Sequence, residues 1–200
     1  MIETLGVDQT AQATPQKRCD WAQSDPLERT YHDEEWGAPK HGSQALFEML
    51  SLEIFQSGLS WQLVLRRREA LRKAFANFDI QTVAGYDQAD VDRLVQNADI
   101  IRNLAKIKAT INNARVIADM FPGEEFDRYC WSFTGGKTIN HDYLTILTTP
   151  RYDHLAEIVS TDMKGIGLKF VGPVTAQSFI QSVGIVNDHM HGCYLNAFQE

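Results

Sequence analysis

The sequence predicts an all-α protein. Apolar residues recur at the three- and four-residue spacing of amphipathic helices in several segments after Ser43. No alternating strand pattern of comparable length competes with them, and no internal repeat or low-complexity segment indicates a solenoid. The chain has 200 residues, of which 44% are hydrophobic, and this is enough to bury a sizeable core. We therefore expect a single domain of two helical lobes over residues 18–200.

The first part of the chain has a different composition. Residues 1–17 mix Thr, Gln, Ala and a Pro without apolar periodicity, so we expect a mobile extension, with order beginning near Cys19. The N-terminus lacks a basic start and a hydrophobic signal core, and no apolar stretch is long enough to cross a bilayer. We expect a cytosolic protein without a membrane partner, in which the three cysteines stay reduced.

Two helices are predicted in the first half of the chain. The first begins at Ser43, the expected N-cap, and continues through apolar residues at helical spacing: Leu46, Phe47 and Leu50. The second follows Ser60 and carries its apolar residues on one side: Trp61, Val64, Leu65, Leu71 and Phe75. This arrangement places a cluster of arginines partly on the opposite face of the second helix.

Four more helices follow from the same periodicity. They cover approximately Asp90–Ala98, Asn103–Met120, Asp153–Asp162 and Pro173–Val183, and Pro122-Gly123 ends the second of them. Residues 134–150 contain Gly135-Gly136, a threonine-rich run and Pro150, which indicates an irregular connection between the lobes.

The charge distribution bears on the class of ligand. The net charge of −7 argues against a general polyanion binder, because affinity for nucleic acid depends on clustered cations. Basic residues do cluster in two places, which are Arg66, Arg67, Arg68, Arg72 and Lys73, and then Arg102, Lys106, Lys108 and Arg115. A local field from these clusters could attract a nucleic acid, and the alternative is that both are solvated helix faces.

A glycine-rich turn joins the last two predicted helices. Gly165-Ile166-Gly167 and Phe170-Val171-Gly172 each offer a register for a helix-hairpin-helix motif, and we favour the second because Thr175-Ala176 follows it at the usual distance. Backbone N–H groups at such a turn form a small anion site, which suits one DNA phosphate. We therefore expect Lys169, Phe170, Val171 and Gly172 to contact DNA, with a plain helix connector as the alternative.

The segment after this hairpin carries a second signal. In helix-hairpin-helix base-excision enzymes a Val-Asp-x-His segment commonly supplies a catalytic Asp at this place, but here that position is Asn187. The missing carboxylate points to a substrate whose bond is already easy to cleave.

Possible metal ligands lie at the two ends of the chain. Cys19 and His32 are near the start, and His189 and Cys193 are four residues apart near the end, the spacing of one face of a helical turn. Two thiolates and two imidazoles form a closed tetrahedral Zn²⁺ site, which is structural because it leaves no open position. Spacing alone leaves other ligands open, namely Asp188, His191, His41 and Cys130.

Several motifs in order resemble the DNA-3-methyladenine glycosylase I family, the bacterial constitutive enzymes. The match covers about Lys17 to Cys193. It is carried by Cys19-Asp20-Trp21, Asp25-Pro26-Leu27, Tyr31 to Gly37, Leu46 to Glu53, Gln56 to Trp61, Trp131-Ser132-Phe133, Lys169 to Gly172, and Val186 to His189. The resemblance implies a helix-hairpin-helix DNA glycosylase fold with a zinc site that joins the N- and C-terminal segments.

The resemblance also implies the site residues. Cys19, His32, His189 and Cys193 fall on the family's zinc ligands, with one structural Zn²⁺ per chain. Tyr31, Trp61 and Glu53 fall on its base-binding pocket, and Glu53 is the expected catalytic residue. Where relatives often carry a tyrosine three positions before Tyr31, this chain has Glu28.

The chemistry of such a substrate agrees with these residues. A 3-methylated adenine nucleoside is cationic and departs as a neutral base, so it needs recognition and exposure more than strong acid catalysis. Trp61 and Tyr31 can stack on the cation, and Glu53 can accept a hydrogen bond from it. We therefore expect a monofunctional hydrolase, without lyase activity, that flips 3-methyladenine from double-stranded DNA and releases the free base.

Leu59 is the expected wedge that fills the gap left by the flipped nucleotide. We expect a monomer. Two other classes of function remain open from the sequence: a DNA-damage binding module without turnover, and a zinc-stabilised protein-interaction domain, for which the acidic charge would be natural.

Overall fold

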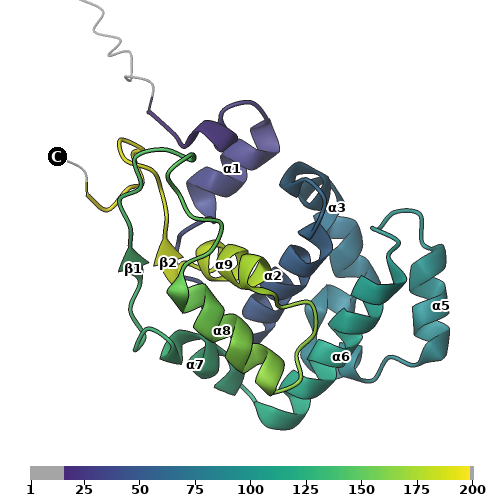
Figure 1. Cartoon of the computed structure of the whole chain (residues 1–200). Coiled ribbons are helices and arrows are strands. Elements are labelled where there is room, and N and C mark those ends of the chain that lie inside the picture. The colour runs from purple at the N-terminus through teal and green to yellow at the C-terminus, as the bar shows by residue number, and fades with distance from the viewer. Residues whose placement is uncertain (1–15, 199–200) are drawn as a thin grey trace, which may run out of the picture.

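The computed structural model describes residues 16–198, and the predicted extension over 1–17 lies outside this range except for its last two residues. The described chain is mainly helical, as predicted (Figure 1). Its longer helices are α1 (Pro26–Glu34), α2 (Ser43–Gln56), α3 (Trp61–Ala74), α5 (Gln88–Gln96), α6 (Leu104–Met120), α7 (Glu125–Ser132), α8 (His154–Gly165) and α9 (Pro173–Ser182). Shorter pieces are η1 (Asp20–Ala22), η2 (Ala76–Phe78) and α4 (Ile80–Ala84).

The helix starts follow from capping side chains. Ser60, Asn103 and Asp153 each accept a hydrogen bond from a backbone N–H of the first turn, at the start of α3, α6 and α8 respectively. The N-cap prediction for α2 is wrong, because Gly42 occupies that position and Ser43 is the first helical residue. The Glu124 carboxylate, which precedes α7, accepts the Ser43 N–H at 2.6 Å and takes over the role of a local cap.

Two short strands lie within the described chain. β1 (Ile139–Asn140) pairs in parallel with β2 (Val186–Asn187), and Ile139 is opposite Val186. The pair ties the irregular segment after α7 to the segment after α9, and both run along the same side of the molecule in Figure 1.

The core is built around α2. Ten of its residues are buried, and the helix packs against α3, α6, α7 and α9. A large set of aromatic side chains is fully buried with it, including Phe47, Phe55, Phe75, Phe78 and Phe179. A helix enclosed on all sides holds its side chains firmly, so α2 is a rigid support for any polar group that it carries.

No helix within residues 16–198 combines the length and the hydropathy needed to span a membrane. The division into two lobes stays a prediction. For the site, the important feature is that α1, α2, α3 and α9 all direct residues toward one cavity.

Candidate active site

A cavity of about 290 Å³ opens between the helices. Its volume suits a single purine-sized ring system rather than a long chain. The lining comes from segments far apart in the sequence: Trp21, Glu28, Tyr31, Trp36, Glu53, Gln56, Trp61, Ile146, Thr149, Ser178, Gln181, Asp188 and Met190. The three predicted base-binding residues, Tyr31, Glu53 and Trp61, are therefore brought together in one pocket.

Glu53 supplies the buried carboxyl group of the pocket. It lies near the C-terminal end of α2, and only 4% of its surface is exposed. Burial alone raises the pKa of Glu53 to about 8, because no cation offsets the loss of water. A carboxyl group in this state favours any ligand that brings a positive charge or a hydrogen-bond donor into the cavity.

Tyr31 and Trp61 form the aromatic part of the wall. Their ring centroids are 4.9 Å apart and their planes are tilted by 53°. The Trp61 indole Nε1 is buried without a hydrogen-bond partner among the described residues, while the Tyr31 hydroxyl has the Ser182 side chain as its polar neighbour. Since buried polar atoms are nearly always paired in folded proteins, the unpaired indole N–H of this pocket residue is compatible with a ligand that completes it.

Asp188 is a second carboxylate at the pocket, and the protein itself occupies both of its oxygens. Oδ1 lies 2.6 Å from His141 Nδ1, while Oδ2 accepts from Gln177 Nε2 at 3.1 Å and from Gln181 Nε2 at 2.6 Å. The spacing left Asp188 open as a metal ligand, but its oxygens point to these partners. Contact with this carboxylate raises the pKa of His141.

Glu28 also lines the pocket, one helical turn before Tyr31 on α1. Partial burial and the neighbouring Asp25 raise the pKa of Glu28. The Glu28 carboxyl group is therefore part of the pocket wall, and it adds acidic character beside the aromatic residues.

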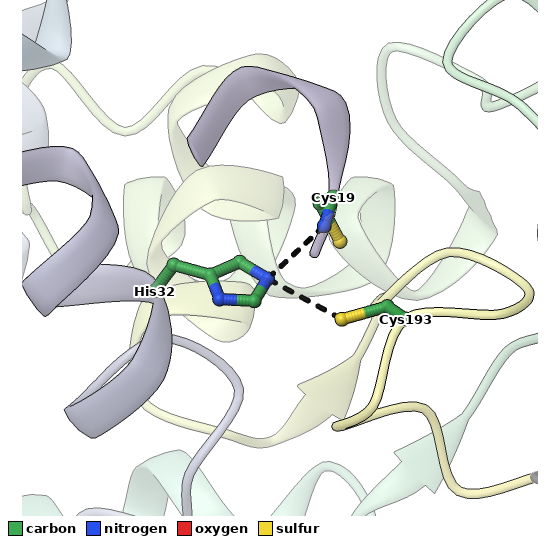
Figure 2. A group of neighbouring side chains, drawn as sticks. All are labelled: Cys19, His32 and Cys193. Atoms are coloured by element: carbon green, nitrogen blue, oxygen red, sulfur yellow. Dashed lines mark hydrogen bonds between the residues drawn. The ribbon is translucent and has the colours of Figure 1, made fainter. Parts of the chain in front are cut away.

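Three of the four predicted metal ligands meet at one place (Figure 2). Ligand atoms of Cys19, His32 and Cys193 all lie within 4.8 Å of one another, and all three residues are buried. His32 Nε2 faces the Cys193 Sγ at 3.4 Å, while His32 Nδ1 lies 2.8 Å from the Asp33 carboxylate. His32 Nε2 also accepts the Cys19 backbone N–H at 3.4 Å, and the carboxylate on Nδ1 fixes the orientation of the ring, as in metal sites.

His189, the fourth predicted ligand, lies beside this cluster but is not part of it. Its ring centroid is 4.8 Å from that of His32, and its Nε2 is buried without a hydrogen-bond partner among the described residues. Asn187 Oδ1 lies 2.7 Å from His189 Nδ1, so Nδ1 carries the proton and Nε2 keeps a free lone pair. Asn187, at the position of the usual catalytic Asp, therefore orients a histidine.

Residues 189–193 do not form the helical turn that the spacing of His189 and Cys193 suggested. A tight turn stands there instead, in which the Cys193 N–H donates to the Met190 carbonyl at 2.9 Å. Gly192 has φ +76°, a conformation that side chains rarely adopt. The turn still brings Cys193 back toward Cys19 and His32.

The other possible metal ligands lie apart from this cluster. His191 pairs with Asp142, His41 pairs with Asp127, and Cys130 is fully buried in the main core. The described residues that could hold a metal together are therefore Cys19, His32 and Cys193, with His189 next to them.

Residues 166–172 connect α8 to α9, and the helix-hairpin-helix motif stays a prediction. Gly172 is the N-cap of α9 and Pro173 is its first residue. Lys169 and Phe170 are exposed, and Phe170 has φ +61°. The Val171 side chain is fully buried, so this residue could reach a ligand only through its backbone.

Leu59 lies on the turn between α2 and α3, and 40% of its surface is exposed. Gly58, with φ +78°, allows the chain to reverse there, and the Leu59 N–H donates to the Gln56 carbonyl at 2.7 Å. An apolar side chain therefore projects two residues before Trp61, at the edge of the pocket.

The two basic clusters are largely used within the fold. Arg68 pairs with Glu35 and Glu48, and Arg72 with Glu48 and Glu69. Arg66 pairs with Asp25, Arg67 and Arg115 donate to backbone carbonyls, and Lys106 is buried. These residues are structural cations, so the local field that they offer to a polyanion is weaker than the sequence suggests.

Some pocket residues were not predicted. Ile146 and Thr149 come from the irregular connection, and Ser178 and Gln181 come from the second half of α9. Trp21 and Trp36 could have been predicted as site residues, because both lie in the motifs that resemble the family.

Comparison with known proteins places the chain among enzymes of one kind. The family model described as methyladenine glycosylase matches residues 21–196. DNA-3-methyladenine glycosylase 1 of Escherichia coli K12 is 44% identical over 178 residues, which are 88% of this chain and 95% of that protein. DNA-3-methyladenine glycosylase of Haemophilus influenzae is 38% identical over 177 residues, with coverage of 88% and 96%.

Solved structures agree with the sequence relatives. A crystal structure of 3-methyladenine DNA glycosylase I has a TM-score of 0.86 at 42% identity, and it covers 90% of this chain and 100% of that one. The Staphylococcus aureus enzyme, described for its recognition of 3-methyladenine, has a TM-score of 0.84 at 33% identity, with coverage of 92% and 98%. The chain therefore belongs to the methyladenine glycosylase family of enzymes.

Proposed function

We propose that this protein hydrolyses the N-glycosidic bond of 3-methyladenine in alkylated double-stranded DNA, after the damaged nucleotide has turned out of the duplex. The observation that carries the proposal is the buried Glu53 carboxyl group, which lines one pocket with the aromatic rings of Tyr31 and Trp61 and has no cation beside it. A related 3-methyladenine DNA glycosylase I was solved in complex with 3-methyladenine, at 33% identity and a TM-score of 0.82.

Glu53 recognises the substrate by charge. The 3-methylated base is cationic while it is attached to the sugar, so it supplies the counter-charge that the buried carboxyl group lacks. Binding then favours the ionised form of Glu53, whose pKa is about 8 in the empty pocket. An ion pair formed in a cavity shielded from water is stronger than the same pair in solvent, so neutral bases gain less from this site.

The bond is then broken with little help from acids. The electron pair of the glycosidic bond moves to the base, which leaves as a neutral molecule, and a water oxygen bonds to the sugar carbon and loses its proton. Tyr31 and Trp61 hold the base by stacking. No lysine lines the described pocket, which supports a monofunctional hydrolase rather than a lyase.

DNA is held outside the pocket. We infer that Leu59 enters the gap left by the extruded nucleotide and that the turn at Lys169, Phe170, Val171 and Gly172 binds one phosphate through its backbone, as in a helix-hairpin-helix motif. These contacts need few cations, which is compatible with the net charge of −7.

We infer that Cys19, His32, His189 and Cys193 hold one structural Zn²⁺. The donor set fits, because two thiols and two imidazoles of fixed tautomer are the ligands that closed zinc sites use. The buried His189 Nε2 without a partner also supports it, since a metal would satisfy this atom. When bound, zinc cross-links the two ends of the domain. We further infer that the protein works as a monomer in the cytosol.

Incubation with methylated DNA tests the function. Chromatography should detect released 3-methyladenine and little or no 7-methylguanine, because the site has weak means of activating a more stable bond. The Trp61→Ala variant should release much less 3-methyladenine than the parent. Free 3-methyladenine should quench the tryptophan fluorescence of the parent but not of the variant, while the melting temperature of the variant changes little.

Two results would contradict the proposal. Tight binding of methylated DNA without any released base would indicate a damage-binding module. Failure to bind abasic DNA at low salt would favour a protein-interaction domain.

A further inference from the structure

The segment that joins β1 to α8 exposes large apolar side chains beside the pocket. In Figure 1 it is the green segment that rises from β1 and then returns to α8. Leu147 is 93% exposed, Leu144 is 67% exposed and Ile146 is 56% exposed. Ile146 and Thr149 line the pocket itself, so the exposed leucines are immediate neighbours of the pocket wall.

Hydrogen bonds give this segment a defined shape. The Thr148 and Thr149 hydroxyls donate to the Thr145 carbonyl at 2.9 and 3.0 Å, and both of their backbone N–H groups reach the same oxygen. At its start, the Tyr143 carbonyl accepts the His191 N–H at 2.9 Å. The tight turn therefore holds Leu144 and Leu147 outward, although exposure of such side chains to water is unfavourable.

The segment that exposes these leucines carries no carboxylate. Residues 143–152 contain no Asp or Glu and one exposed cation, Arg151, in a protein whose net charge is −7. A surface without carboxylates can approach a polyanion without local charge repulsion. The preceding acid, Asp142, already lies beside His191.

The same kind of side chain stands at a second place on the pocket edge. Leu59 precedes the pocket-lining Trp61 by two residues, and Leu147 directly follows the pocket-lining Ile146. Any duplex that delivers a nucleotide into the cavity must pass close to both segments.

We propose that Leu144 and Leu147 form a second DNA contact, separate from Leu59, that packs against sugars and unstacked base edges next to the extruded nucleotide. The inference rests on the proposed function. Apolar side chains are used in this way where a duplex is kinked, because unstacked bases expose apolar surface. DNA is the occupant that fits, since the leucines continue from the base pocket and the segment lacks acidic groups.

The test compares a Leu144→Ser/Leu147→Ser variant with an Ile158→Ser control, which removes an exposed apolar side chain of α8 that does not line the pocket. Fluorescence anisotropy with duplex DNA that contains an abasic site should show affinity weakened by about tenfold or more in the double variant only. The DNA affinity of the double variant should fall with salt concentration at the same slope as that of the parent, because no phosphate contact is removed. Quenching of tryptophan fluorescence by free 3-methyladenine should be unchanged, because the double variant keeps Ile146, which lines the pocket.

A duplex with 2-aminopurine beside the abasic site gives a second measurement. The parent should raise the fluorescence of this base by unstacking it, and the double variant should raise it less. The inference is wrong if the double variant binds and unstacks DNA like the parent. It is also wrong if sedimentation shows that the leucines join two copies of the chain while DNA affinity is unaffected. Loss of DNA binding and base release in the parent itself would instead overturn the proposed function.

Discussion

Glu53 is the residue whose surroundings differ most from those of an ordinary carboxyl group. It is buried on a helix that is itself enclosed by the core, and no cation lowers its pKa. In a protein without a ligand such a residue is a cost to stability, because water solvates a carboxylate better than a closed cavity does. This cost is consistent with the proposed role of Glu53 in binding a cationic base.

This cost predicts how stability depends on pH. Below about pH 4.5 the carboxyl group is protonated in both states, while between about 4.5 and 8 the folded protein retains a proton that the unfolded chain loses. The free energy of unfolding therefore falls as pH rises through this window. Glu53→Gln should remove that fall and make the variant more stable than the parent at pH 8, by up to a few kcal/mol.

Urea titrations of both proteins at pH 5 and pH 8 measure this difference. The same variant should excise 3-methyladenine poorly, since it cannot ionise. Parallel pH dependence in the two proteins, together with full activity of Glu53→Gln, would mean that Glu53 is not the charge-bearing group of the pocket.

At the scale of an element, the turn between α2 and α3 carries Leu59 and leads into Trp61. A buried lysine from α6 supports it. Lys106 Nζ donates to the Phe55 carbonyl at 2.8 Å and to the Ser57 carbonyl at 2.5 Å, so it satisfies carbonyls at the C-terminal end of α2. A cation is favourable there because the helix dipole places negative charge at that end.

Lys106→Met should destabilise the protein by about 1–3 kcal/mol, because the buried Phe55 carbonyl and the Ser57 carbonyl lose their donor. The looser turn should also weaken DNA binding, since it carries Leu59. Denaturation and abasic-DNA binding measure the two effects. Lys108→Met, on an exposed position of the same helix, is the matched control and should change neither. Equal stability of both variants would remove Lys106 from this supporting role.

Helices were predictable where the sequence supplied both a period and a cap. α6 has a long apolar repeat and Asn103 as its N-cap, and the predicted end at Met120 is the observed one. α1 was not predicted, although Asp25 and Pro26 are good starting signals, because nine residues with few apolar side chains give little periodicity. The start of α2 depends on Glu124, which is 81 residues away, and no local pattern records such a contact.

The site was predictable to the extent that motifs carry it. Tyr31, Trp61 and Glu53 came from the resemblance, and the fold brings them to one cavity. Ile146 lines that cavity from a segment without periodicity, so nothing in the sequence marked it. The partners of Asp188 are set by how α9 packs, which explains why spacing alone could not exclude this residue as a metal ligand.

At the scale of the whole molecule, the two ends of the domain meet. The Met190 N–H lies 3.4 Å from Cys19 Sγ, and the Tyr194 N–H donates to the Lys17 carbonyl at 2.9 Å. Cys19, Met190 and Cys193 form a small apolar cluster separate from the main core. Such a small cluster is a weak fastening by itself, so a metal that joins its ligands would add much of the stability of this region.

We therefore expect one Zn²⁺ per chain by elemental analysis, and a lower melting temperature after the metal is removed by a chelator. Joining residues as distant as Cys19 and Cys193 restricts the unfolded chain, and the binding energy of the metal adds to folding. Cys193→Ser should lose the zinc and have a lower melting temperature. At a temperature where the variant is still folded, its release of 3-methyladenine should be largely retained.

The control for the loss of zinc is Cys130→Ala. Cys130 is a buried thiol that packs in the main core and does not belong to the cluster of Cys19, Met190 and Cys193. This variant should be less stable because of a small cavity but should keep its zinc. His191→Gln should also keep it, because His191 pairs with Asp142 instead. If the purified protein contains no metal and chelation leaves its melting temperature unchanged, the two ends are held by packing alone and the zinc site is not part of this fold.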